Sequence, residues 1–148
     1  MKKVLLFFFL IITLLLSFFF LKNQNKKAPL ATINNHTFNL EVVKSQKDQE
    51  IGLSKYNSIS DNFAMLFPFG KEGNYSFWMK NMKFPIDIIF IRDKKIVKIF
   101  NRVPYPKSES EKLPIYTPGS LSDTVLEINA GLSKKYGFRE GQEVEIKY

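Results

Sequence analysis

Four side chains suited to recognition or acid–base chemistry lie close together in one apolar stretch, FWMKNMKFPIDIIFI, at residues 77–91. They are Trp78, Lys80, Asn81 and Asp87. An indole ring can stack on the flat face of a ligand, and lysine and asparagine side chains supply hydrogen-bond donors. We therefore predict that Trp78, Lys80 and Asn81 line a shallow binding surface.

Asp87 stands between isoleucines in a strand-like run, and an ionised carboxylate is costly to bury without a partner. We predict that it is a structural polar residue, held by Lys80, Arg92, Arg102 or backbone N–H groups. A purely structural interpretation of the whole stretch pairs Asp87 with Lys80 at a sheet edge and makes Trp78 a core or rim plug. Both interpretations remain open from the sequence.

A third interpretation of the stretch is catalytic. Lys80, paired with Asp87, would act as a base or nucleophile in a hydrolase or transferase. Such chemistry normally needs further groups, and no serine or second carboxylate with a clear role lies beside the pair. We favour a binding module over an enzyme.

Several other site chemistries are excluded or weakened by composition. The chain has no cysteine, which excludes disulfides, thiolate catalysis and cysteine metal sites. His36 is the single histidine, so a multi-histidine metal site is impossible. Thioethers of Met65, Met79 and Met82 could hold a soft metal such as copper, but methionine packs irregular cores well and these three do not share a face. We predict core packing for the methionines, no metal and no cofactor.

The first 27 residues, MKKVLLFFFLIITLLLSFFFLKNQNKK, predict where the protein resides. Residues 4–21 form an apolar run broken only by Thr13 and Ser17, and 18 helical residues span about 27 Å, enough for a thin bilayer. The run ends in bulky residues rather than the small ones that a signal peptidase needs. We predict an uncleaved single-pass anchor in the cytoplasmic (inner) membrane, with the domain facing the periplasm or outside.

The formal net charge of +8 is modest and spread along 148 residues without a dense basic run. Nucleic-acid binding usually needs clustered positive charge, so we predict no nucleic-acid partner. A mildly basic surface near anionic lipid is the simpler explanation.

The remaining elements are expected to be short strands joined by tight turns. Asn34-Asn35 predicts a hairpin turn in an alternating stretch, and Ser45 predicts the start of a short helix ending near Tyr56. Pro68 is expected to end the strand NFAMLFPF. Strands are further predicted over 75–82, 86–92, 95–103 and 123–129 and at the C-terminus, with a turn at 93–94.

Two more features complete the expected organisation. Residues 104–120 carry four prolines and no periodicity, which predicts a long functional or mobile loop. The stretch AGLSKKYG predicts a two-turn helix with Asn129 as its N-cap and Gly137 as its stop. Counting gives about seven short strands and two short helices, typical of a partly closed barrel or rolled sheet.

Four stretches resemble a known family in their order and spacing: QEIGLS, AMLFPF, FWMKNMKFPIDIIFI and VLEINAGLSKKYGFREGQEVEI. Across about residues 38–148 the chain resembles the bacterial and archaeal family called domain of unknown function 192. The resemblance implies a small β-rich, barrel-like domain that is often exported or tethered to a membrane. Because the family's biochemical activity is not established, the resemblance implies no reaction.

We therefore expect three segments: a membrane anchor or uncleaved signal at 1–23, a linker at 24–31 and one β-rich domain at 32–148. The fold class is mostly β (α+β), a small barrel-like or rolled mixed sheet with two short helices after one transmembrane helix. The expected function is a membrane-tethered extracytoplasmic binding or envelope-accessory module. Its partners would be the membrane, through residues 4–21, and an envelope glycan, peptide or protein.

Overall fold

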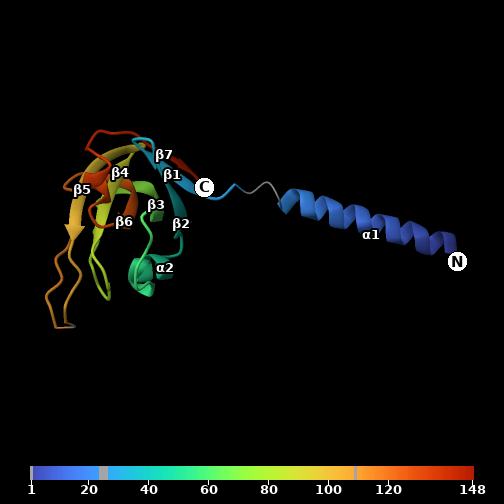
Figure 1. Cartoon of the computed structure of the whole chain (residues 1–148), viewed down its shortest axis with the longest axis horizontal. Coiled ribbons are helices and arrows are strands. Elements are labelled where there is room, and N and C mark those ends of the chain that lie inside the picture. The colour runs from blue at the N-terminus through green and yellow to red at the C-terminus, as the bar shows by residue number, and fades with distance from the viewer. Residues whose placement is uncertain (1, 24–26, 109) are drawn as a thin grey trace.

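The structure is a computed structural model that describes residues 2–23, 27–108 and 110–148, and within the first range the side chains of Val4 and residues 6–19. Helix α1 (Lys2–Asn23) precedes the β domain (Figure 1). Among the residues described in this way, no helix is both long and apolar enough to cross a membrane. The predicted linker lies partly on residues 24–26, which are outside the described ranges.

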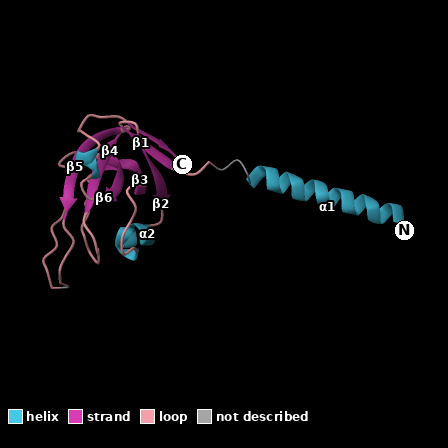
Figure 2. Ribbon diagram, viewed as in Figure 1, coloured by secondary structure: helices cyan, strands magenta, loops and turns pink. Residues whose placement is uncertain are grey.

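The domain is built on one curled sheet of seven strands (Figure 2). The strand order is β5-β4-β6-β3-β2-β1-β7. The strands are β1 (Leu30–Ile33), β2 (His36–Val42), β3 (Phe63–Gly73), β4 (Ile86–Arg92), β5 (Lys95–Val103), β6 (Ser122–Asn129) and β7 (Val144–Lys147). Within this sheet only β2 and β3 pair in parallel, so the sheet is mixed.

Short-range turn chemistry sets two of the hairpins. Asn34 and Asn35 join β1 to β2 with φ of 48° and 63°, and Asp93 and Lys94 join β4 to β5 with φ of 49° and 61°. Left-handed backbone at both central positions belongs to the tight turn whose twist matches antiparallel strands. Both predicted hairpin turns are confirmed.

The sheet curls until its two outermost strands, β5 and β7, come into contact. Ile96 at the start of β5 donates its N–H to the carbonyl of Gln142 and accepts from the N–H of Gly141, at 2.9 and 2.7 Å. The N–H of Val144 in β7 donates to the carbonyl of Lys94 at 2.7 Å. The predicted mostly β fold with a rolled mixed sheet is confirmed, in the form of a curled half-barrel.

Apolar side chains cover both faces of this sheet. The inner cluster, which includes Leu66, Ile89 and Leu126, packs inside the curl with helix α3 (Leu132–Lys135). The outer cluster, which includes Met65 and Ile88, lies on the opposite face. Strands β4 and β6 are therefore apolar on both sides, as central strands with two covered faces must be.

Two short helices and one 3₁₀ turn lie beside the sheet. Helix α2 (Gln46–Ile51) begins at Ser45, whose Oγ accepts the N–H of Asp48 at 3.1 Å, and continues into the 3₁₀ turn η1 (Gly52–Lys55). This confirms the predicted cap. The prediction for α3 was wrong in two respects. The helix has four residues, Leu132–Lys135, instead of two turns, and Gly131, with φ of 85°, precedes it as the cap while Asn129 bonds elsewhere.

The structure corrects two strand predictions. Residues 74–85 form a loop instead of a strand, with only a single bridge from Phe77 to Tyr116. Asn81 has φ of 59°, and this turn breaks the alternation assumed from the sequence. Pro68 lies inside β3 rather than ending it. The strand still pairs with β6 there, opposite Thr124, but its pairing with β2 ends at Leu66, so the edge that faced β2 needs no N–H from Pro68.

Candidate ligand-binding pocket

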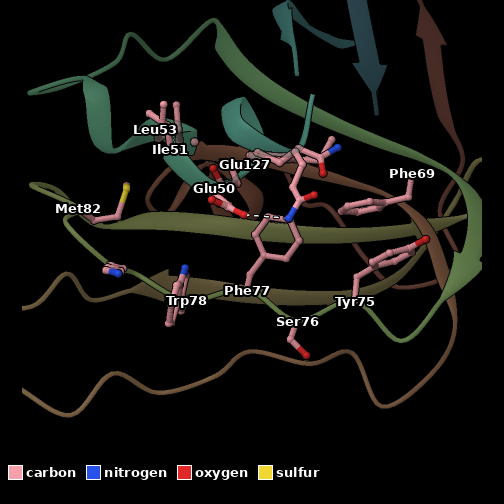
Figure 3. A pocket seen from close by; sticks show the side chains of 15 residues that line it. Glu50, Ile51, Leu53, Phe69, Tyr75, Ser76, Phe77, Trp78, Met82 and Glu127 are labelled. Atoms are coloured by element: carbon pink, nitrogen blue, oxygen red, sulfur yellow. Dashed lines mark hydrogen bonds between the residues drawn. The ribbon is translucent and has the colours of Figure 1, made fainter. Parts of the chain in front are cut away.

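A pocket of about 210 Å³ opens in the cover of the outer face, between α2–η1 and the loop 74–85 (Figure 3). It combines aromatic walls with a few polar groups, the usual composition of a small-molecule site. The lining residues are Gln46, Gln49, Glu50, Ile51, Gly52, Leu53, Phe67, Phe69, Tyr75, Ser76, Phe77, Trp78, Lys80, Met82 and Glu127.

Glu127, on strand β6 between β4 and β3, is the buried acidic residue of the pocket lining. Its neighbours across the ladders are Met65 of β3 and Ile88 of β4, both fully buried. Glu127 is 5% exposed, and its Oε2 has no hydrogen-bond partner among the described residues. A buried carboxyl without a partner is costly, which marks this position as a functional candidate.

Burial raises the pKa of the Glu127 carboxyl from 4.5 to about 8. The cause is desolvation, because apolar surroundings disfavour the charged form of an acid. At neutral pH the group therefore carries its proton and is able to donate a hydrogen bond. Such perturbed carboxyls concentrate at binding and catalytic sites.

Aromatic rings form the walls of the pocket. Phe69 and Tyr75 stack face to face with 3.6 Å between ring centroids, and Figure 3 shows them side by side. Phe77 meets Phe67 edge-on at 5.0 Å. These contacts fix the rings before any ligand arrives, so little side-chain entropy remains to be lost on binding.

Trp78 stands at the mouth of the pocket and is 51% exposed. It also lines a small neighbouring hollow with Ile115 of the long loop. The Nζ of Lys80 lies 5.1 Å from the Trp78 ring centroid, within the range of a cation–π contact. Tryptophan and lysine thus flank the entrance together.

The remaining rim is helix α2 together with Gly52, which follows it. Gln46 Nε2 donates to Glu50 Oε1 at 3.1 Å, and Gln49 Nε2 donates to the carbonyl of Val43 at 3.3 Å. Gly52 ends the helix with φ of 50° and donates its N–H to the carbonyl of Asp48. That left-handed backbone favours glycine, which lets the chain turn directly above Glu127.

The structure brings together two of the three predicted binding residues. Trp78 and Lys80 line the same pocket, whereas Asn81 lines a separate groove next to Lys80, with Pro106 and Lys107 of the long loop. Neither binding surface includes Asp87.

Asp87 is fully buried on the inner face, facing α3 and the bulge in β5. Its Oδ1 accepts the N–H groups of Arg102 and Gly131 at 2.7 and 2.8 Å, and its Oδ2 accepts the N–H of Ser133 at 2.9 Å. Within the described residues it has no ion pair with Lys80. Of the donors considered from the sequence, only backbone N–H groups hold it, and the Lys80–Asp87 pair of the catalytic interpretation is not formed.

Glu127 is the functional candidate that sequence reasoning missed. The stretch DTVLEIN was predicted only to form a strand, and Glu127 was given no role. The available signal was its position between Val125, Leu126 and Ile128, all fully buried, because a charged residue inside an otherwise apolar central strand needs an explanation.

The methionines and the histidine considered as metal ligands make other contacts in the structure. Met65, Met79 and Met82 are buried in the outer cluster, so they share one side of the sheet, contrary to the sequence-based expectation. His36 stacks on the ring of Tyr136 at 3.7 Å between centroids. In the described part of the chain, no group of three His, Asp or Glu side chains could hold a metal ion.

Comparisons with known proteins agree with this architecture. The sequence model of the DUF192 family, described as "Uncharacterized ACR", matches residues 29–146. A crystal structure of a protein of unknown function from Novosphingobium aromaticivorans DSM 12444 is similar at 27% identity, with a TM-score of 0.68, over 80% of this chain and 83% of that chain.

A candidate transcription regulator from Sinorhizobium meliloti 1021 is similar at 29% identity, with a TM-score of 0.72. The match covers 82% of this chain and 94% of that chain. No curated protein matches the chain.

Proposed function

We propose that this chain, which belongs to the DUF192 family, is a membrane-tethered extracytoplasmic module that binds a small envelope ligand in the pocket above Glu127. The ligand would be a glycan or peptide fragment, or an exposed side chain of a partner protein. The module would act by recognition and not by catalysis.

Tethering is supported by the apolar run at residues 4–21, which has the length and composition of a membrane anchor. The side chains described within α1, such as Phe8, Leu14 and Phe19, are apolar and more than half exposed. Large apolar surface of this kind normally contacts lipid or protein. Positive charges flank the run on both sides, with Lys2 and Lys3 before it and Lys22, Lys26 and Lys27 after it.

Binding is supported above all by one observation: a carboxyl without a partner, 5% exposed, lies in a pocket whose mouth carries a half-exposed tryptophan. A stable core would normally fill such a position with an apolar side chain or give the carboxyl a donor. A ligand that bonds Glu127 and stacks on Trp78 would satisfy both groups.

The test is a ligand screen read through Trp78, which is the only tryptophan in the chain. Full-length protein in non-ionic micelles is titrated with envelope saccharides, muropeptides and short peptides. We expect at least one class to shift or protect the Trp78 emission saturably, and Glu127→Leu to weaken that response at least tenfold. Glu72→Gln, at an exposed position on β3, serves as the control and should bind like the wild type.

The proposal fails if no class of compound gives a saturable response, or if Glu127→Leu binds the responding compound as tightly as the wild type. Either result would mean that Trp78 and Glu127 do not bind a ligand together.

A further inference from the structure

The groups around Glu127 indicate which functional group the ligand carries. This inference rests on the proposed function. We propose that the pocket takes the ammonium group of an amine-bearing ligand, with Glu127 as its ionic partner and Trp78 as its cation–π wall. Primary amines on peptides and amino sugars have this chemistry.

Once Glu127 is ionised, the charges around the pocket favour a cation. The carboxylates of Glu127 and Glu50 then line the pocket against one lysine, Lys80. The α2 residues on the rim, Gln46, Gln49, Glu50 and Ile51, include no basic side chain.

The aromatic walls favour the same ligand. The negative face of an aromatic ring attracts ammonium groups, and Trp is the strongest partner. Trp78 already has an ammonium group near its ring, since the Nζ of Lys80 lies 5.1 Å from the centroid. Within the described residues Lys80 forms no ion pair with a carboxylate. A ligand amine would lie near the Trp78 ring as Lys80 does, and it would also contact the carboxylate of Glu127.

The proton balance follows directly from the state of Glu127. The group is neutral at pH 7 because burial raises its pKa to about 8. On binding, the carboxyl releases its proton to solvent, the ligand nitrogen keeps its own, and a charge-assisted N–H···O bond forms. The other titratable groups at the pocket are Glu50 from α2 and Tyr75 and Lys80 from the loop 74–85, while β3 and β4 contribute only apolar neighbours to Glu127.

This balance makes the pH dependence diagnostic. A cation that requires ionised Glu127 should bind about 50-fold more tightly at pH 8 than at pH 6, because the ionised fraction rises from about 1% to about half. A neutral ligand that accepts a hydrogen bond from protonated Glu127 would show the opposite trend, with affinity falling above pH 8.

The experiment compares n-propylammonium chloride with n-propanol, which differ in charge but have similar length. Full-length protein in non-ionic micelles is titrated at constant ionic strength at pH 6, 7 and 8, with Trp78 emission as the signal. The variants are Glu127→Gln, which keeps the shape without the charge, Lys80→Met, which removes the competing cation, and Glu72→Gln as the matched surface control. Circular dichroism checks that each variant is folded.

We expect n-propylammonium to bind at least tenfold more tightly than n-propanol at pH 8, with affinity rising from pH 6. Glu127→Gln should lose both the preference and the pH dependence. Lys80→Met should bind the cation at least twofold more tightly, because a like charge is removed from the mouth of the pocket. The Glu72→Gln control should match the wild type.

Equal or tighter binding of n-propanol overturns the inference, as does a cation preference that survives in Glu127→Gln. Weaker cation binding by Lys80→Met also contradicts it, because removing a like charge from the mouth of the pocket should strengthen the binding of a cation. If neither probe binds while a neutral saccharide does, the ammonium assignment fails and the proposed function stands. If neither the probes nor any compound of the ligand screen binds, both fail.

Discussion

Replacing Glu127 with glutamine should change how stability depends on pH. In the folded chain the pKa of this carboxyl is about 8, against 4.5 for the ordinary group. Between these two values the folded state holds a proton that the unfolded state has lost. The free energy of unfolding therefore falls as pH rises: the stabilisation is fully present below pH 4.5 and is lost by about pH 8.

The size of the effect follows from this shift. From pH 5 to pH 9, the raised pKa of Glu127 lowers the free energy of unfolding by about 4 kcal/mol, at 1.36 kcal/mol for each pKa unit. That is a large share of the 5–15 kcal/mol that stabilises a typical domain. Glutamine has no proton to lose in this range, so Glu127→Gln should not show this loss.

The assay is urea unfolding of the full-length wild type and Glu127→Gln in non-ionic micelles at pH 5, 7 and 9, followed by Trp78 emission. A buried amide can itself lack a partner, which would lower the stability of the variant by a constant amount. The informative quantity is therefore the difference between the two proteins, which should move by about 4 kcal/mol in favour of the variant from pH 5 to pH 9. A difference that stays constant across this range would refute the assignment of a buried neutral carboxyl.

Three further outcomes are expected. Asp87→Asn should lower the free energy of unfolding by about 1 to 3 kcal/mol, measured by urea unfolding, because the new amide N–H₂ would face the N–H of Ser133 that Oδ2 now accepts; unchanged stability would contradict this. Trp78→Ala should lower the free energy of unfolding by only about 1 to 2 kcal/mol, since the ring is half exposed. In the wild type, iodide or acrylamide should quench Trp78 emission, and a shielded ring would contradict its position at the mouth of the pocket. Full-length protein should stay in the membrane fraction after carbonate washing, and a mature N-terminus near residues 22–32 would show that the segment at 4–21 is removed.

Local chemistry in the sequence was enough to predict the turns and one helix. Asn34-Asn35 and Asp93-Lys94 are short polar pairs between alternating strands, and their backbone preferences act within two residues. Ser45 caps α2 through a contact three residues away. Such features need no knowledge of the rest of the fold.

The loop at 74–85 and the burial of Glu127 depend on distant partners, which the sequence pattern does not show. Phe77 pairs with Tyr116 across almost 40 residues, so apolar alternation alone could not distinguish this loop from a strand. The acidic residue at 127 is buried because β6 lies between β3 and β4 and because α2–η1 and the loop cover the outer face. Strand order and covering loops are long-range properties, and they decide which polar residue in a strand faces a pocket.

The proposed binding function depends most on Glu127 being a proton-bearing carboxyl at neutral pH. Its titration can be followed directly by NMR in the full-length protein labelled with ¹³C at the glutamate side-chain carboxyl, with Glu127→Gln identifying the resonance. The structure predicts a midpoint near pH 8, far above the ordinary carboxyl value of 4.5. A midpoint near 4.5 would mean that the carboxyl is solvated or paired in solution, and it would contradict both the neutral state and the pocket chemistry built on it.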